Sequence, residues 1–133
     1  MLPPAIIVHG LSDIRTALAP GRKVTLLSAP GAALYAGTAW WAELLRIANT
    51  KTPAFLDCAA APGRAFEALA LGVPGIILAP CPAWDQLAAH AAARGATLLA
   101  AAPPALDLSK PGAAQALESW LTGNYCPKLP AGT

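Results

Sequence analysis

Short apolar runs alternate along this chain with segments in which apolar residues recur at helical spacing. Each run is apolar at nearly every position, which is typical of strands buried on both faces of a parallel sheet. A run of this kind is followed each time by a turn rich in proline or glycine and then by a helical segment. Five strands are therefore predicted, at residues 5–8, 24–27, 54–56, 76–78 and 97–100.

A helix is expected after each strand. The clearest helical pattern is Trp41, Leu44, Leu45 and Ala48, whose spacing predicts one face turned toward the sheet. This helix is expected to begin between Gly31 and Thr38. The other helical segments are expected at about residues 11–19, 62–71, 83–94 and 111–122, with Pro62 in a first turn and Gly72 closing a helix in a left-handed conformation.

Strict alternation of strands and helices predicts the α/β class, with a five-stranded, mostly parallel sheet. The length of 133 residues favours a doubly wound, flavodoxin-like three-layer sandwich with helices on both faces of the sheet. The alternative is a (βα) half-barrel fragment with strands in sequence order, which dimerisation would complete. We expect residues 1–123 to form a single domain, followed by a C-terminal tail at residues 124–133.

The composition excludes several classes of protein. Nine basic and seven acidic residues are scattered along the chain, so no basic face for nucleic acid is expected. The apolar runs are too short to cross a membrane, and no signal peptide is evident at the N-terminus. The three cysteines show no CxxC spacing, which favours reduced thiols in the cytoplasm and argues against a zinc site. We expect no metal and no cofactor.

Ligands of open α/β sheets bind at the carboxyl ends of the strands, so any site should lie at that edge. Cys58 could act as a nucleophile if His9 were its neighbour, but buried packing of the thiol is the simpler interpretation. Ser28 and Gly31 belong to an SAPGA turn at a helix start, which could hold a phosphate or carboxylate. The candidate ligand-binding residues are His9, Ser28, Gly31, Asp57, Cys58 and Cys81.

Three classes of function are compatible with the sequence. The first is a small cytoplasmic domain that binds a small anionic ligand at the carboxyl ends of the strands. The second is a structural or protein-interaction module without a ligand site. The third is a weak lyase- or aldolase-like enzyme, although no lysine follows a strand to form a Schiff base. Whether the chain is an enzyme is left open by these residues.

A homodimer or larger homo-oligomer is expected from the second helical segment. Trp41 and Leu44 fill its inward face, so Trp40 and Ile47 must lie on its flank. Only 12% of the residues are charged, and an apolar flank on such a surface is typical of an interface. Trp40 and Ile47 are therefore the interface candidates.

Overall fold

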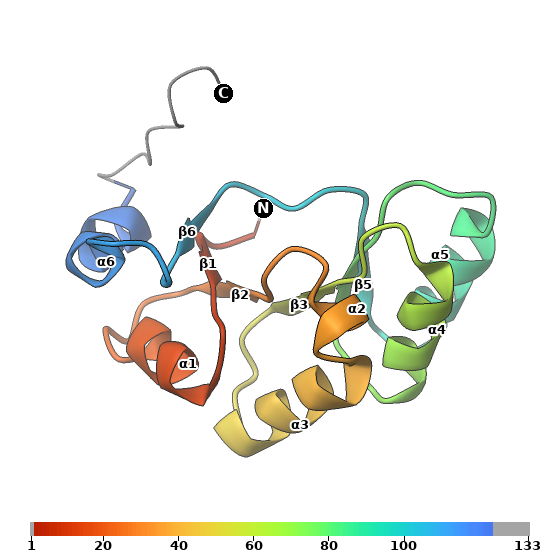
Figure 1. The fold of residues 1–133 in the computed structure, drawn as a ribbon, viewed down its shortest axis with the longest axis horizontal. Coiled ribbons are helices and arrows are strands. Elements are labelled where there is room, and N and C mark those ends of the chain that lie inside the picture. The colour runs from red at the N-terminus through yellow and green to blue at the C-terminus, as the bar shows by residue number, and fades with distance from the viewer. Residues whose placement is uncertain (1, 124–133) are drawn as a thin grey trace.

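The computed structural model describes residues 2–123, which form one sheet with helices packed against it (Figure 1). Each strand is three or four residues long, and each follows or precedes a helix at close distance in the chain. The elements are β1 Ala5–Ile7, α1 Leu11–Leu18, β2 Thr25–Leu27, α2 Ala32–Tyr35, α3 Thr38–Ala48, β3 Ala54–Asp57, α4 Pro62–Ala70, β4 Gly75–Ile77, α5 Trp84–Ala93, β5 Thr97–Leu99, β6 Ala105–Asp107 and α6 Ala113–Leu121.

The sheet confirms the α/β class with parallel strands and alternating helices. Its order in the described part of the chain is β5-β4-β3-β2-β1-β6, and every neighbouring pair is parallel. The five expected strands are all present, and β6 is a sixth that pairs with β1 in the register Ala5 to Ala105. In a flavodoxin-like order β1 would lie between β2 and β3, whereas here β1 lies between β2 and β6.

The helices pack on one face of the sheet, so the layering differs from the expected three-layer sandwich. Strands β1 to β5 follow one another across the sheet in chain order. Right-handed crossovers that all advance in one direction must place their helices on the same side. Side chains from all six described helices accordingly share one apolar core with the strands, which we call the helix-side core and which includes Ile14, Ala33, Trp41, Leu69, Leu87 and Leu117. Sequential strand order is also the feature that the half-barrel alternative anticipated.

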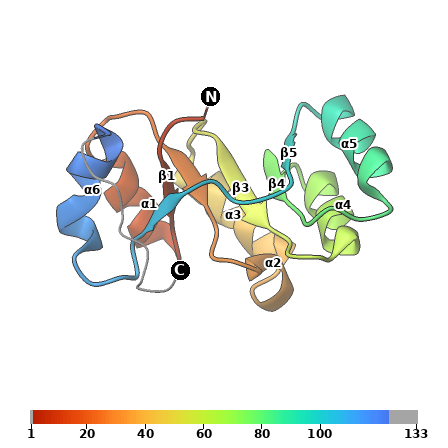
Figure 2. The ribbon, with the colours of Figure 1, turned by 90° about the horizontal axis from the view of Figure 1, so that it is seen from above.

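The opposite face of the sheet is covered by an extended segment, residues 100–104, which we call the strap. It connects β5 to β6 and crosses the sheet in front of the intervening strands (Figure 2). Three-residue strands present only one or two side chains each to this face, so a single extended segment can cover them. Beneath it lies a second apolar cluster, the strap-face row, in which Ala5, Leu27, Phe55 and Ile77 are buried.

Local backbone signals account for several element boundaries. The expected single helix after β2 is two helices, because Gly37 adopts a positive φ of 94° between α2 and α3. Pro62 opens α4 as expected, and Gly72 follows it with a φ of 83° in the left-handed region. The predicted tail, residues 124–133, lies outside the described residues. No helix among residues 2–123 is both long enough and apolar enough to cross a membrane.

Candidate functional site

The carboxyl ends of the parallel strands bring most of the predicted site residues to one edge of the sheet. His9 follows β1, Ser28 follows β2, and Cys81 lies beyond the end of β4. Asp57 is the last residue of β3 and Cys58 the next. Because β2 separates β1 from β3, His9 and Cys58 do not come from neighbouring strands. The cysteine–histidine pairing that the sequence allowed is therefore not built by this sheet order.

His9 forms a polar cluster with two residues that the sequence reading did not select. Its Nε2 lies 2.7 Å from Oδ1 of Asp107, the last residue of β6, and its backbone N–H donates to Asp13 Oδ2 at 2.9 Å. Ser109 donates to the same Oδ1 of Asp107 from its backbone N–H at 2.9 Å and from its hydroxyl at 2.8 Å. We call His9, Asp107 and Ser109 the His9 cluster.

The carboxylate of Asp107 is the centre of the His9 cluster. Partial burial by itself would raise the pKa of Asp107, but the hydrogen bonds from His9 and from both donors of Ser109 outweigh it, so the pKa is lowered. An ionised carboxylate can only accept, so Nε2 of His9 is the donor of this hydrogen bond. Within residues 2–123, Nδ1 of His9 has no hydrogen-bond partner, and the side chain is 36% exposed.

Replacing Asp107 with asparagine is expected to cost about 1–2 kcal/mol of folding free energy at pH 7, since the three hydrogen bonds to Oδ1 lose the negative charge of their acceptor. The lowered pKa means that the folded state binds the proton less tightly than the unfolded chain. The stabilisation is thus fully present above the unfolded value near pH 4 and is lost as the pH falls through the folded value. Urea unfolding of both proteins between pH 7 and pH 3 measures this.

The matched control for this prediction is Asp85→Asn, because Asp85 is exposed and makes no side-chain hydrogen bond to a described residue. It is expected to change stability by less than about 0.5 kcal/mol at pH 7. An Asp107→Asn deficit that stayed constant down to pH 3 would contradict the role assigned to the carboxylate.

Ser28 and Asp57 serve the backbone at the ends of β2 and β3. The Ser28 hydroxyl accepts the backbone N–H of Asp57 at 2.9 Å and donates to the carbonyl of Ala29 at 3.1 Å, with the residue only 3% exposed. Oδ1 of Asp57 accepts the backbone N–H of Ala59 at 2.8 Å, closing a turn in which Ala59 has a positive φ of 52°. Their polar atoms therefore fix two strand ends to each other and to the following turn.

The two described cysteines differ in exposure, and neither is placed beside a base. Cys58 has no exposed surface, and its thiol lies 3.8 Å from the carbonyl oxygen of Leu56. Burial, with a smaller contribution from the charge of Asp57, raises the pKa of Cys58 to about 12. Its thiol consequently stays protonated at neutral pH and acts as a packing group. Cys81 is a half-buried free thiol that packs against the helix-side core.

Gly31 precedes α2 with a φ of 69°, a conformation in the left-handed region. The helix that it opens has only four residues, so few backbone N–H groups are aligned there. Leu34 and Tyr35 in α2 are 53% and 70% exposed. Gly31 therefore shapes the turn at the carboxyl edge, and α2 presents apolar side chains to solvent beside it.

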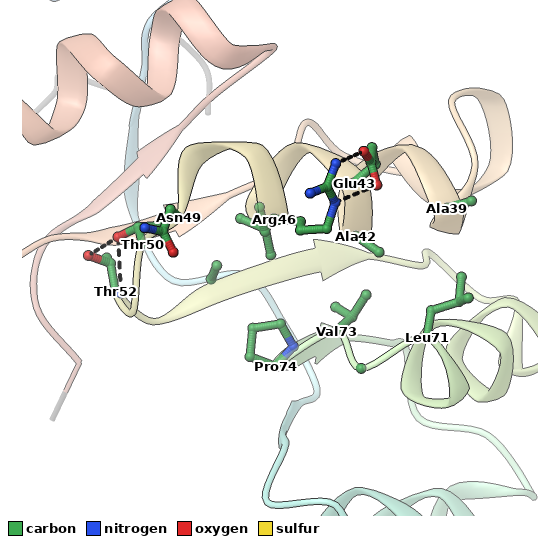
Figure 3. Close-up of a pocket in the computed structure, with 13 residues that line it drawn as sticks. Ala39, Ala42, Glu43, Arg46, Asn49, Thr50, Thr52, Leu71, Val73 and Pro74 are labelled. Atoms are coloured by element: carbon green, nitrogen blue, oxygen red, sulfur yellow. Dashed lines mark hydrogen bonds and ion pairs between the residues drawn. The ribbon is translucent and has the colours of Figure 1, made fainter.

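A groove of about 640 Å³ lies at the opposite, amino-terminal edge of the sheet (Figure 3). Helix α3 forms one wall, and the turn from α4 to β4 forms the other. Glu43 and Arg46 form an ion pair on the α3 wall, and the hydrogen bond from Arg46 lowers the pKa of Glu43. The hydroxyls of Thr50 and Thr52 bond to each other at 2.9 Å. Glu43, Arg46, Thr50 and Thr52 of this groove are thus paired among themselves.

Trp40 and Ile47 lie on the flank of α3, as the helical spacing predicts. Trp40 is half-buried and its ring centroid lies 5.8 Å from that of Trp41 at an angle of 45°, so it packs against the helix-side core. Ile47 is 50% exposed. Ile47 is therefore the more exposed of the two interface candidates.

The His9 cluster depends on two residues that sequence reasoning missed, Asp107 and Ser109. Asp107 ends a strand of three residues and Ser109 follows it, and the pairing of that strand with β1 spans about a hundred residues of chain. The available signal was the run Ala105 to Leu108, in which two leucines flank an aspartate directly after Pro103–Pro104. This run is too short to predict a strand without knowledge of its partner β1.

The function has to be inferred from this geometry, because comparison with known proteins found no match. No protein-family model matches the chain, and neither a curated protein nor a solved structure matches it. Among residues 2–123 no group of three or more histidine, cysteine, aspartate or glutamate side chains is arranged to hold a metal ion.

Proposed function

We propose that this domain binds a small anionic ligand at the carboxyl edge of the sheet, between β1 and β6, and that His9 is its main polar contact. The main supporting observation is that Nε2 of His9 lies 2.7 Å from Oδ1 of Asp107, while Nδ1 has no hydrogen-bond partner in residues 2–123. When both ring nitrogens carry a proton, Nδ1 can donate to a phosphate or carboxylate while Nε2 donates to Asp107.

The position of His9 in the fold supports this proposal. Ligands of open α/β sheets bind where the strand order reverses, and here the order turns from β1 to β6. Helix α1 begins at Leu11, so its unpaired N–H groups and the positive end of its dipole lie next to His9 in the chain. An anion at this place would meet both a helix start and an imidazole. The free thiols Cys58 and Cys81 support a location in the cytoplasm.

The His9 cluster favours binding over nucleophilic catalysis. In a nucleophile–base–acid triad the histidine lies between the hydroxyl and the carboxylate. Here the carboxylate of Asp107 lies between Ser109 and His9, because the Ser109 hydroxyl donates to Asp107 at 2.8 Å. The serine is therefore not activated by the imidazole.

Thermal-shift measurements with inorganic phosphate, simple carboxylates, sugar phosphates and nucleotides test this function. An anion present at a hundred times its dissociation constant adds about 2.7 kcal/mol of stability and should raise the Tm by several degrees. We expect His9→Gln to abolish the shift. His90→Gln is the matched control, because His90 is exposed on α5 and its ring packs edge-on against Phe66.

Two results would contradict the binding function. One is the absence of a shift with every anion of the panel, and the other is an equal shift in His9→Gln and in the native chain. Either would favour the interaction module instead. That second candidate rests on large apolar side chains that are 49% exposed or more in the described part of the chain, namely Leu34, Tyr35, Ile47 and Leu71.

A further inference from the structure

The β6–α6 unit, residues 105–121, is connected covalently to the preceding strands through the strap. The strap leaves β5 at one end of the sheet and reaches β6 at the other, so it passes four other strands in five residues (Figure 2). Four of the five strap residues are exposed, and Pro103 is half-buried. The connection is thus a single extended segment with little packing of its own.

The extended length of the strap is close to the distance that it must span between β5 and β6. Neighbouring strands lie about 4.8 Å apart, so five steps across a flat sheet span about 24 Å. The chain from Leu99 to Ala105 makes six residue steps, which reach at most about 20–22 Å when fully extended. The sheet must therefore curl, and the strap must stay extended, for β6 to reach its own β1. Two consecutive prolines, Pro103 and Pro104, stiffen the segment further.

The contacts of the β6–α6 unit are made with the first part of the chain. Strand β6 pairs with β1 along three residues. Asp107 binds His9, Glu118 accepts from Nε of Arg22 at 2.5 Å, and Nε1 of Trp120 donates to the carbonyl of Ala5 at 2.7 Å. Each of these contacts joins residues about a hundred positions apart. A second copy of the chain presents the same partners, so the unit can dock on that copy with identical contacts.

We propose that two copies of this chain exchange their β6–α6 units and form a twofold-symmetric dimer. A short connection under constraint favours such an exchange, because the taut segment relaxes when it reaches across to a partner. The exchange also frees the strap from its own sheet, and the strap-face rows of the two copies can then pack on each other. In this dimer Asp107 and Ser109 of one copy complete the His9 cluster of the other.

Lengthening the strap tests the exchange through the mass of the full chain. We expect light scattering at micromolar concentration to give twice 13.5 kDa for the native chain. A flexible Gly-Ser insertion of about six residues between Ala101 and Ala102 relaxes the strap and should return the mass to one copy. A monomeric native chain, or a dimer that the insertion leaves unchanged, would overturn the proposal.

Charge reversal at Arg22 and Glu118 separates an exchanged dimer from a dimer through another surface. Arg22→Glu and Glu118→Arg each place like charges together in their own homodimers. When the two variants are refolded together, an exchanged heterodimer joins opposite charges at both of its junctions. Native mass spectrometry should then show a heterodimer fraction well above the half that random pairing gives.

The ion pair of Glu43 and Arg46 provides the matched control, because both residues lie within α3 and are not exchanged. A mixture of Glu43→Arg and Arg46→Glu should give random pairing. Random pairing of the Arg22 and Glu118 variants as well would place the dimer contact elsewhere, for example on the Ile47 flank, and would overturn the exchange. The readout is mass alone, so the outcome is independent of whether the anion-binding function holds.

Discussion

Replacing Gly75 with alanine is expected to destabilise the fold by about 2–3 kcal/mol. Gly75 is the first residue of β4 and lies beside Phe55 of β3 on the strap side of the sheet. A Cβ atom there would lie 2.6 Å from the carbonyl oxygen of Ala54 and 2.6 Å from the ring of Phe55. The carbonyl belongs to the sheet backbone and cannot move aside, so the two strands would have to separate or the ring to leave its place.

Gly63→Ala is the matched control for this substitution. Gly63 lies in the first turn of α4, and a Cβ built there meets no atom within 4 Å. Alanine favours a helix over glycine by up to about 1 kcal/mol, so this variant should be as stable as the native chain or slightly more stable. Urea unfolding of the three proteins measures both effects. Equal midpoints for the two variants would show that the ring of Phe55 does not occupy the space over Gly75.

Trp41→Ala should cost about 3–5 kcal/mol, which is a large part of the stability of a domain of this size. Trp41 is fully buried between α3 and the sheet, and truncation leaves a cavity in the helix-side core. Trp40→Ala is the control, because the adjacent ring is only half-buried and should cost about 1–2 kcal/mol. Similar losses for the two variants would contradict the difference in burial.

A third variant separates the packing of Trp41 from its polar atom. Nε1 of Trp41 is buried and has no hydrogen-bond partner among the described residues. An unpaired buried N–H costs about 1–3 kcal/mol, and Trp41→Phe removes it while most of the ring volume remains. We therefore expect Trp41→Phe to lose less than about 1.5 kcal/mol. Its unfolding midpoint should lie much closer to that of the native chain than to that of Trp41→Ala.

The local elements of this fold could be predicted because each depends on neighbours in the sequence. Apolar runs located the first five strands within one or two residues, and Pro62 and Gly72 marked the ends of α4. The inward position of Trp41 followed from helical spacing. Strand β6 could not be found in this way, because three residues after a Pro-Pro pair carry too little hydrophobic pattern and the strand is defined by its distant partner β1.

The candidate site was harder to predict. The sequence shows which polar residues end the strands, but it does not show which of them form hydrogen bonds to backbone groups. Ser28 and Asp57 are engaged with backbone groups of neighbouring turns, and Cys58 is packed beneath them. His9 is the one sequence candidate that the sheet order brings to a carboxylate from another strand. That carboxylate, Asp107, is identified only by the β1–β6 pairing.

The pairing of the first strand with the last also determines how the chain folds during synthesis on the ribosome. Strands β1 to β5 are neighbours in chain order, so each can add to the sheet as it leaves the exit tunnel. Until β6 emerges, one edge of β1 carries unpaired backbone N–H and C=O groups, and such an edge can join that of another nascent chain. On a polysome, where nascent copies lie close together, residues 105–121 thus decide whether β1 is completed by its own chain or by a neighbouring one.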